Sequence, residues 1–428
     1  MTYSVMPLKR VLSRNDGGVW GEEPQGLADS VVLRSTDQSA NGQWLEVEPA
    51  LRSLTRSEHV KAQLLAGDLL LTKSSGSAQH IGKTTLVTEA IAELKPAFSN
   101  FMQRLRVRSG NAPAFYWYCF RSTFVRNQLN LISTTTTGLA NLNASTIGDL
   151  IVPVPKVEEQ RLIADYLDVQ TAKIDTLIEK QEQLIELLAE RRQAVISHAV
   201  TKGLDPNVTM TESGYEWVGQ TPAHWRASPF VRLTTGRVDY RGATPRKTTE
   251  GVQLITARNV KKGFIDREAS REYVAEEDYA VVMSRGIPEI GDVLLTMEAP
   301  LGNVAIVNDV DVAFAQRIIK FRLDRTKLLP GFANYLLNGF QFQQQLLSKA
   351  TGSTALGLKA SKLIELLVST PPLAEQKQII EHLDHETSRI DALSSKAGEM
   401  IDILKERRQA LISAAVTGKI DVRGMVSA

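Results

Sequence analysis

Cysteine is almost absent from this chain, which has Cys119 alone among 428 residues. One thiol excludes a disulfide framework and a multi-cysteine metal site, so we expect a buried, reduced side chain in a cytosolic protein. The sequence also lacks any run of about eighteen apolar residues, and the opening MTYSVMPLKR has no apolar stretch behind its charges. We therefore expect a chain that is neither exported nor membrane-spanning.

Residue patterns typical of catalysis are missing as well. Gly82-Lys83-Thr84 resembles the end of a nucleotide-binding phosphate loop, but the first glycine of that loop would fall at Ser77. The six histidines are scattered without metal-ligand spacing. No nucleophile, base or carboxylate pair recurs in both halves, although a duplication would have preserved a shared active site. The sequence thus predicts a binding protein that is not an enzyme and uses no cofactor or metal.

The main feature that is present is an internal repeat. Residues 159–205 and 375–421 align without a gap at an offset of 216 and are identical at 23 of 47 positions. Because the offset is about half of the chain length, the sequence indicates a duplicated half-protein.

Each copy of the repeat predicts a long helix. Residues 157–202 contain no Gly or Pro, and the copies are preceded by Pro155 and Pro371-Pro372 and followed by Gly203 and Gly418. Apolar residues at spacings of three and four predict a buried stripe on each helix. The predicted stripes are Leu167, Ile174, Leu177, Leu184, Leu188 and Val195, and Leu383, Ile390, Leu393, Met400, Leu404 and Leu411.

One helix cannot bury such a stripe alone. We predict that the two helices pack as an antiparallel coiled coil related by a pseudo-twofold axis. We also expect some isoleucines to face outward, available to partner proteins. These are Ile163, Ile178, Ile185, Ile196 and Ile412.

The rest of the chain predicts two domains built on one plan. GDLLLT at position 67 and GDVLLT at 291 mark equivalent strands, and the loop after the strand is eight residues longer in the first copy. Such a length change between matching frameworks suggests different recognition loops. The expected fold is mixed α+β, with two α/β domains separated by the long helices. The expected division is 1–155 and 206–371 for the domains, 156–205 and 372–421 for the helical spacers, and 422–428 for a tail.

The charge is unevenly distributed. The net charge is only +2, but residues 226–262 hold nine basic residues against two acidic ones. A solvated surface would account for this cluster, and a surface that follows phosphates would account for it better.

The layout resembles the specificity subunit of type I restriction-modification systems over essentially the whole chain. A domain ending in a Gly/Ser/Thr loop, then P-x-x-x-EQ and a long helix closing on ERRQA-x-IS-x-AVT, occurs twice. Residues 211–225 and the RGATPRK loop are similar to the entry of that family's second target-recognition domain. The first domain lacks the G-x-TP loop found at Gly242-Thr244-Pro245. The resemblance implies that each domain reads half of a split site in double-stranded DNA, that the helices set the spacing, and that two methyltransferase subunits and restriction subunits assemble with the chain.

Side-chain chemistry suggests which residues contact DNA. For bases we predict the loops after the two GD strands, since Gln and Asn can address adenine, Lys guanine and Glu cytosine. These residues are Lys73, Ser74, Ser75, Gln79, His80, Lys83, Thr296, Glu298 and Asn303. For phosphates we predict the basic cluster and its polar neighbours. These residues are Arg241, Thr244, Arg246, Lys247, Arg258, Asn259, Lys261 and Lys262.

Alternatives remain open from the sequence. Each of these side chains also fits an ordinary surface position, and Gln316-Arg317 after Phe314 could be a structural strand end. The competing function is a coiled-coil adaptor whose domains bind a protein and not DNA. An enzyme with an unrecognised active site is a third interpretation.

Overall fold

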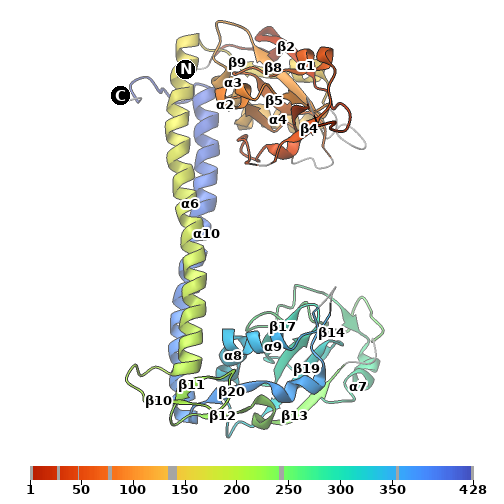
Figure 1. Ribbon diagram of the computed structural model, residues 1–428, viewed down its shortest axis with the longest axis vertical. Helices are drawn as coiled ribbons and strands as arrows, with labels where there is room; N and C mark the ends of the chain where they lie inside the picture. Colours follow the sequence, from red (N-terminus) through yellow and green to blue (C-terminus); the bar gives the residue numbers. More distant parts are fainter. Residues whose placement is uncertain are drawn as a thin grey trace. The chain divides into compact units, whose positions relative to one another are not determined.

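The computed structural model describes residues 3–26, 29–46, 48–75, 80–133, 142–240, 245–352 and 356–425. The chain divides into two compact units. The first comprises Met1–Glu182 and Gly398–Ala428, and the second comprises Gln183–Ala397. Each unit therefore combines one globular domain with a part of each long helix, α6 and α10 (Figure 1).

The first domain is built around a four-stranded antiparallel sheet in the order β2-β8-β5-β6. Its strands are β2 Leu12–Gly17, β8 Met102–Val107, β5 Leu69–Thr72 and β6 Thr84–Leu86. A second sheet has the order β4-β3-β7, in which β3 and β7 are parallel. Its strands are β3 Ser30–Leu33, β4 Ala50–Arg52 and β7 Ala97–Phe98, and β1 Val5–Pro7 pairs separately with β9 Ile151–Pro153.

The helices of this domain are short, and the aromatic residues of one of them fill the core. They are α1 Arg56–Ala62, α2 Glu89–Glu93, α3 Pro113–Arg121, α4 Thr123–Ser133 and α5 Ala144–Gly148, with 3-10 turns η1 Leu8–Arg10 and η2 Ser35–Asp37. Helix α3 begins at Pro113, where the missing N–H is no loss. Its run Phe115–Phe120 is buried throughout and packs with residues of α6 and α10 in one cluster.

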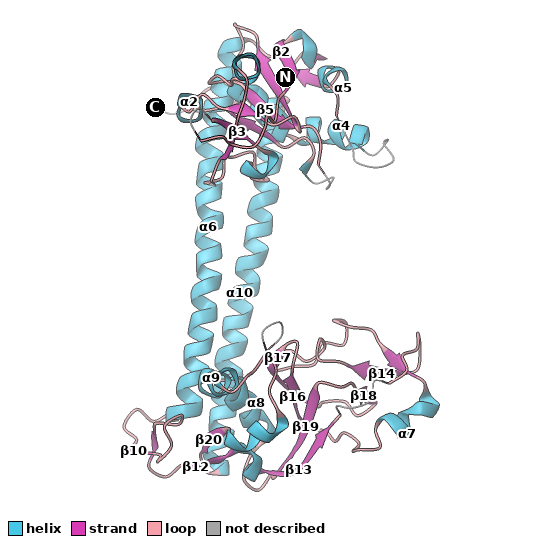
Figure 2. Cartoon of the chain, turned by 45° about the vertical axis from the view of Figure 1, so that its right-hand side comes forward, coloured by secondary structure: helices cyan, strands magenta, loops and turns pink. Residues whose placement is uncertain are grey.

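The second domain repeats the plan. Its four-stranded sheet has the order β13-β19-β16-β17, and its three-stranded sheet the order β15-β14-β18 (Figure 2). The strands are β12 Arg226–Pro229, β13 Thr234–Asp239, β14 Val252–Ile255, β15 Tyr273–Val274, β16 Val293–Met297, β17 Leu301–Ile306, β18 Val312–Phe314, β19 Ile318–Leu323 and β20 Leu367–Thr370. A hairpin of β10 Met210–Glu212 and β11 Gln220–Pro222 precedes them. The helices are α7 Tyr279–Val282, α8 Pro330–Asn338 and α9 Phe340–Ser348, with 3-10 turns η4 Phe230–Leu233, η5 Glu276–Asp278 and η6 Ala360–Glu365.

The two predicted long helices are confirmed. Helix α6 spans Val157–Lys202 and α10 spans Leu373–Val416. In the first unit, the start of α6 clusters with the end of α10, as Ile163 does with Ile412. In the second unit, the end of α6 clusters with the start of α10, as Ile196 does with Ile379. The pairing is therefore antiparallel, as predicted.

The predicted stripe is confirmed at Leu167, Ile174, Leu188, Leu383, Ile390 and Leu404, which are buried, whereas Val195 and Leu411 are half-buried. The buried stripe differs from the prediction at its other positions. Most of its members repeat between the helices at an offset of 216. The repeating members are Ile163, Leu167, Thr171, Ile174, Leu188, Ile196 and Ala199 in α6, and Ile379, Leu383, Thr387, Ile390, Leu404, Ile412 and Ala415 in α10. Ile178 in α6 and Ala397 and Ile401 in α10 are buried without a buried counterpart at that offset. The prediction that Ile163, Ile178, Ile196 and Ile412 face outward was wrong, and Ile185 is half-buried. Leu177, Leu184, Leu393 and Met400, assigned to the stripe, are exposed.

The reason is that neighbouring residues such as Leu177 and Ile178 both satisfy a three-and-four spacing. Only packing decides which of two such neighbours is buried.

Among the described residues, no helix is both long and apolar enough to cross a bilayer.

Candidate nucleic-acid interface

Three chain segments converge at one edge of the second domain. Strands β14 and β18 are parallel, with Ile255 beside Phe314, so the residues that follow them leave the sheet together. Strand β16 ends where Thr296 faces Ile318, the first residue of β19. The loop after β16 therefore reaches the same edge.

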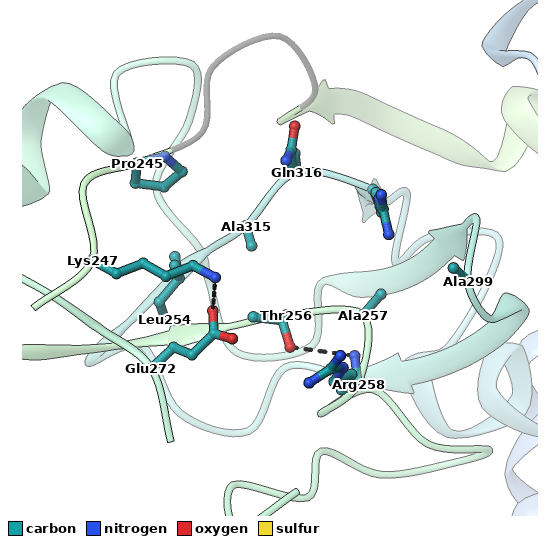
Figure 3. Close-up of a pocket in the computed structure, with 11 residues that line it drawn as sticks. Pro245, Lys247, Leu254, Thr256, Ala257, Arg258, Glu272, Ala299, Ala315 and Gln316 are labelled. Atoms are coloured by element: carbon teal, nitrogen blue, oxygen red, sulfur yellow. Dashed lines mark hydrogen bonds and ion pairs between the residues drawn. The ribbon is translucent and has the colours of Figure 1, made fainter. Parts of the chain in front are cut away.

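These segments enclose a cleft of about 270 Å³. Figure 3 shows Ala315 and Gln316 on one side, Thr256 and Arg258 on another, and Lys247 facing Glu272. The lining residues are Pro245, Lys247, Leu254, Thr256, Ala257, Arg258, Glu272, Ala299, Ala315, Gln316 and Arg317.

Backbone hydrogen bonds hold the cleft segments in place. The Ala315 amide donates to the Ile255 carbonyl at 2.8 Å, and the Met297 amide donates to the Arg317 carbonyl at 2.8 Å. The Asn259 side chain accepts from the Thr256 amide at 2.9 Å and donates to the carbonyls of Asp266 and Ser270, each at 2.9 Å. Arg258, between Thr256 and Asn259, is thus presented on a fixed turn.

The cleft is predominantly basic. Lys247 pairs with Glu272 at 2.7 Å, which leaves Arg258 and Arg317 as the further charges among its lining residues. Arg317 lies 4.0 Å from Glu298, a long distance for an ion pair between half-exposed side chains. An excess of guanidinium groups in a polar hollow suits a phosphate or a base edge.

The first domain has the same arrangement of strand ends. The Ser99 amide donates to the Leu33 carbonyl at 2.9 Å, and the Lys73 amide donates to the Phe101 carbonyl at 3.0 Å. Asp37 accepts from the Arg34 amide at 2.7 Å, as Asn259 does from Thr256. The edge that forms the cleft in one domain therefore has an equivalent in the other.

A duplicated ion pair lies at the opposite end of the strands that lead to these edges. Arg106 donates to Asp68 at 2.6 Å, and Arg322 donates to Asp292 at 3.1 Å. The hydrogen bonds that Arg106 donates to Asp68 raise the pKa of Arg106. Burial raises the pKa of Asp292, but hydrogen bonds from Arg322 and Lys320 bring it below its usual value. The GD dipeptide before each strand thus has a structural role.

The base-contact candidates of the first domain separate into three groups. Lys73, Ser74 and Ser75 are half-buried at the edge, burial lowers the pKa of Lys73, and His80 is exposed. Gln79 lies outside the described residues. Lys83 requires a correction, because its ammonium is buried and donates to the carbonyls of Ser35 and Gln38 at 2.9 Å.

Two candidates of the second domain also require correction. Thr296 is buried, and its hydroxyl accepts from the Asn303 amide at 2.9 Å. The Asn303 side chain donates to the Val260 carbonyl at 2.8 Å. Both residues brace β16 against its neighbours, whereas Glu298 is half-exposed beside the cleft.

Most of the described phosphate candidates are accessible. Arg246, Lys247, Arg258 and Lys262 are exposed, and Lys261 is half-buried. Arg241 and Thr244 lie outside the described residues. Asn259 is corrected to a structural residue, because it is buried and its amide is used within the turn.

Sequence reasoning missed several cleft residues. Thr256, Gln316 and Arg317 line the cleft, and Gln316-Arg317 had been weighed only as a structural strand end. A signal did exist, since the pair follows Ala313-Phe314 after one intervening residue, Ala315, and Ala313-Phe314 repeats Ala97-Phe98 at the offset of 216. Among the residues described here, no cluster of three or more His, Cys, Asp or Glu side chains could hold a metal ion.

A family model for the type I restriction modification DNA specificity domain matches residues 46–187 and 263–397. The chain belongs to this family. The two matches cover more than half of the chain, and each includes the strand that follows a GD dipeptide and part of a long helix.

Relatives within the specificity family are distant in sequence. The chain is 22% identical to the StySPI specificity subunit of Salmonella potsdam, over 82% of this chain and 74% of the relative. It is 24% identical to the MjaVIII specificity subunit of Methanocaldococcus jannaschii, over 84% and 80%. It is 21% identical to the EcoKI specificity subunit of Escherichia coli, over 82% and 75%.

Solved structures show the same fold. A chain from a study of complex assembly and conformational transition in a type I R-M system matches with a TM-score of 0.75 at 16% identity, covering 98% of both chains. The HsdS subunit from Thermoanaerobacter tengcongensis matches with a TM-score of 0.56 at 17% identity, covering 98% of this chain and 97% of that one. The specificity-family fold thus extends over almost the whole chain.

Proposed function

We propose that this chain is the DNA-recognition subunit of a type I restriction-modification complex and has no catalytic activity of its own. The observation that carries the proposal is the double match to the DNA specificity domain, one in each half of the duplicated chain. Each globular domain binds one half of a bipartite site in double-stranded DNA. The basic cleft of the second domain and the equivalent edge of the first are the proposed contact surfaces.

The proposed division of labour follows the repeat. Residues 1–155 and 206–371 act as the two recognition domains, 156–205 and 372–421 as helical spacers, and 422–428 as a tail. The spacers determine the separation between the half-sites, since an α-helix is a stiff element that rises about 1.5 Å per residue. The single reduced Cys119 and the DNA target favour a cytoplasmic location.

The proposed protein partners are two methyltransferase subunits, with restriction subunits in the full complex. The long helices carry exposed apolar residues that repeat at the offset of 216, one set in each unit. The first unit has Leu177, Met400 and Ile403, and the second has Leu393, Leu184 and Leu187. Exposed apolar side chains arranged in two equivalent sets suit two copies of one partner.

Methylome sequencing tests the proposal directly. Cells that carry this chain with a methyltransferase partner should methylate one bipartite motif, and cells without the chain should not. The adaptor alternative predicts methylation that does not depend on the chain. A salt titration of duplex binding gives an independent measurement, because phosphate contacts produce a log-linear loss of affinity with salt.

A further inference from the structure

Arg317 and Phe101 occupy the same place in the two domains. Each lies at the junction between the short parallel strand and the central strand, β18 and β19 in one domain and β7 and β8 in the other. The carbonyl of each accepts the amide of the residue at the end of the neighbouring central strand, Met297 or Lys73. The two positions differ by the repeat offset of 216.

The backbone at this junction is fixed by hydrogen bonds, while the side chain is exposed. Arg317 has φ of 78°, a left-handed conformation that residues other than glycine adopt rarely. Two backbone hydrogen bonds hold this conformation. The Ala315 amide donates to the Ile255 carbonyl, and the Met297 amide donates to the Arg317 carbonyl. Its side chain is 48% exposed at the cleft. A fixed backbone with an accessible side chain is what base recognition requires.

Phe101 is also exposed, at 55% of its surface. An aromatic ring exposed to water on this duplicated turn suggests contact with an apolar surface. The residue before it is Asn100, which is exposed, and the residue before Arg317 is Gln316, so both turns carry an amide at that position.

Framework residues at the opposite end of these strands are duplicated, whereas the exposed residues on the turn differ. The arginine–aspartate pairs Arg106–Asp68 and Arg322–Asp292 are the same in both domains. At the exposed position, arginine in one domain replaces phenylalanine in the other. That is the pattern expected if the framework is shared and each domain reads a different half-site.

We propose that Arg317 and Phe101 are equivalent specificity-determining residues, each reading one base pair of its domain's half-site. Arg317 donates its guanidinium fork to the O6 and N7 acceptors of a guanine, and Phe101 packs on the methyl group of a thymine. This inference rests on the DNA-recognition function proposed above.

The test selects preferred sites from a library of randomised double-stranded DNA, using the full-length chain assembled with its methyltransferase partner. Arg317→Ala and Arg317→Gly both remove the fork, and glycine keeps the left-handed backbone without strain. In both variants, the preference for guanine over the other bases at one position of one half-site should fall by about ten- to a hundredfold. The other half-site should be unchanged. Phe101→Ala should weaken a thymine preference in that other half-site alone.

Arg258→Ala is the matched control, because it removes an exposed guanidinium from the same cleft. It should weaken binding to all sequences about equally and leave the motif intact. The inference is overturned if Arg317→Gly behaves like Arg258→Ala, or if the motif is the same in all variants. A wild-type chain that selects no bipartite motif would instead refute the proposed function.

Discussion

The Tyr118 hydroxyl donates a 2.6 Å hydrogen bond to the Asp168 carboxylate, joining helix α3 of the first domain to helix α6. Tyr335 and Asp384 form the same bond at 2.6 Å between α8 and α10 in the second unit. Nearby, the Gln160 side chain accepts from the Ala112 amide at 2.8 Å, and Gln376 accepts from Leu329 at 2.8 Å. Each domain is therefore joined to its long helix by the same two side-chain hydrogen bonds.

Replacing Tyr118 with Phe should destabilise the first unit by about 2 kcal/mol at neutral pH, the usual contribution of a hydrogen bond to a charged group. Burial raises the pKa of Asp168, and the hydrogen bond from Tyr118 opposes that shift. Without the Tyr118 hydroxyl, the pKa of Asp168 rises further. The variant therefore loses most stability at pH values where the Asp168 carboxyl is ionised. Urea unfolding at about pH 7 and about pH 4 should show a smaller loss of stability at the lower pH, because the raised pKa of Asp168 means that a larger fraction of the carboxyl is protonated there.

Tyr335→Phe is the matched control for that prediction. Tyr118 is fully buried and Tyr335 is only half-buried, so the second substitution should cost less. Equal losses at both pH values would show that the Asp168 charge has no part in the Tyr118 contribution.

The salt dependence of DNA binding should separate the basic residues of the second domain. Arg246→Ala, Arg258→Ala and Lys262→Ala should each lower the salt slope by about one, because each removes an exposed charge that neutralises a phosphate. Lys247→Ala should lower it less, because Lys247 is paired with Glu272 at 2.7 Å. Fluorescence anisotropy over a range of salt concentrations measures the slopes.

If one of these substitutions changes the selected DNA motif and leaves the salt slope unchanged, the replaced residue contacts a base and not a phosphate. Asn259→Ala is the contrasting variant, since its amide is used inside the turn. It should lower the free energy of unfolding by about 1–3 kcal/mol through buried groups that lose their partners.

The exposed apolar residues of the helices should control how many methyltransferase subunits bind. A double substitution of Leu184 and Leu187 by Glu should reduce the complex from two copies to one, because the equivalent set in the first unit is untouched. The chain itself should stay folded, since both side chains are solvent-exposed. Native mass spectrometry gives the stoichiometry.

Met400→Glu with Ile403→Glu is the symmetric counterpart and should also leave one copy bound. Two copies retained by both variants would mean that the partners dock elsewhere on the chain.

The spacing between half-sites should follow helix length. A seven-residue insertion near Gln181 in α6, with a matching one near Ala397 in α10, keeps the buried stripes in phase and adds about 10 Å, or about three base pairs. The half-site sequences should stay the same while the spacer lengthens. Methylation of duplexes with graded spacers would report the shift.

The same insertion in one helix alone is the control, and it should loop out or unpair without defining a new spacer. If the well-folded double insertion keeps the original spacer preference, the helices hold partners and do not set the distance along DNA.

The sequence by itself determined the duplication and the two long helices, because both follow from the order of residues along the chain. Identity at a constant offset needs no knowledge of contacts, and a stretch of 46 residues without Gly or Pro has few alternatives to helix. The equivalence of the two GD strands was also visible in the sequence.

The spacing predicted buried positions such as Leu167 and Leu383 correctly, but only the tertiary structure decided between adjacent apolar residues, since Leu177 and Ile178 fit the same spacing and only Ile178 is buried. The same holds for Lys83, Asn259 and Thr296, whose polar groups satisfy the fold and are buried within it. Residues 256–258 and 315–317 are far apart in the chain, and they share a cleft because β14 and β18 run parallel. Pairing between distant strands leaves no local pattern, so this part of the interface could not be read from the sequence.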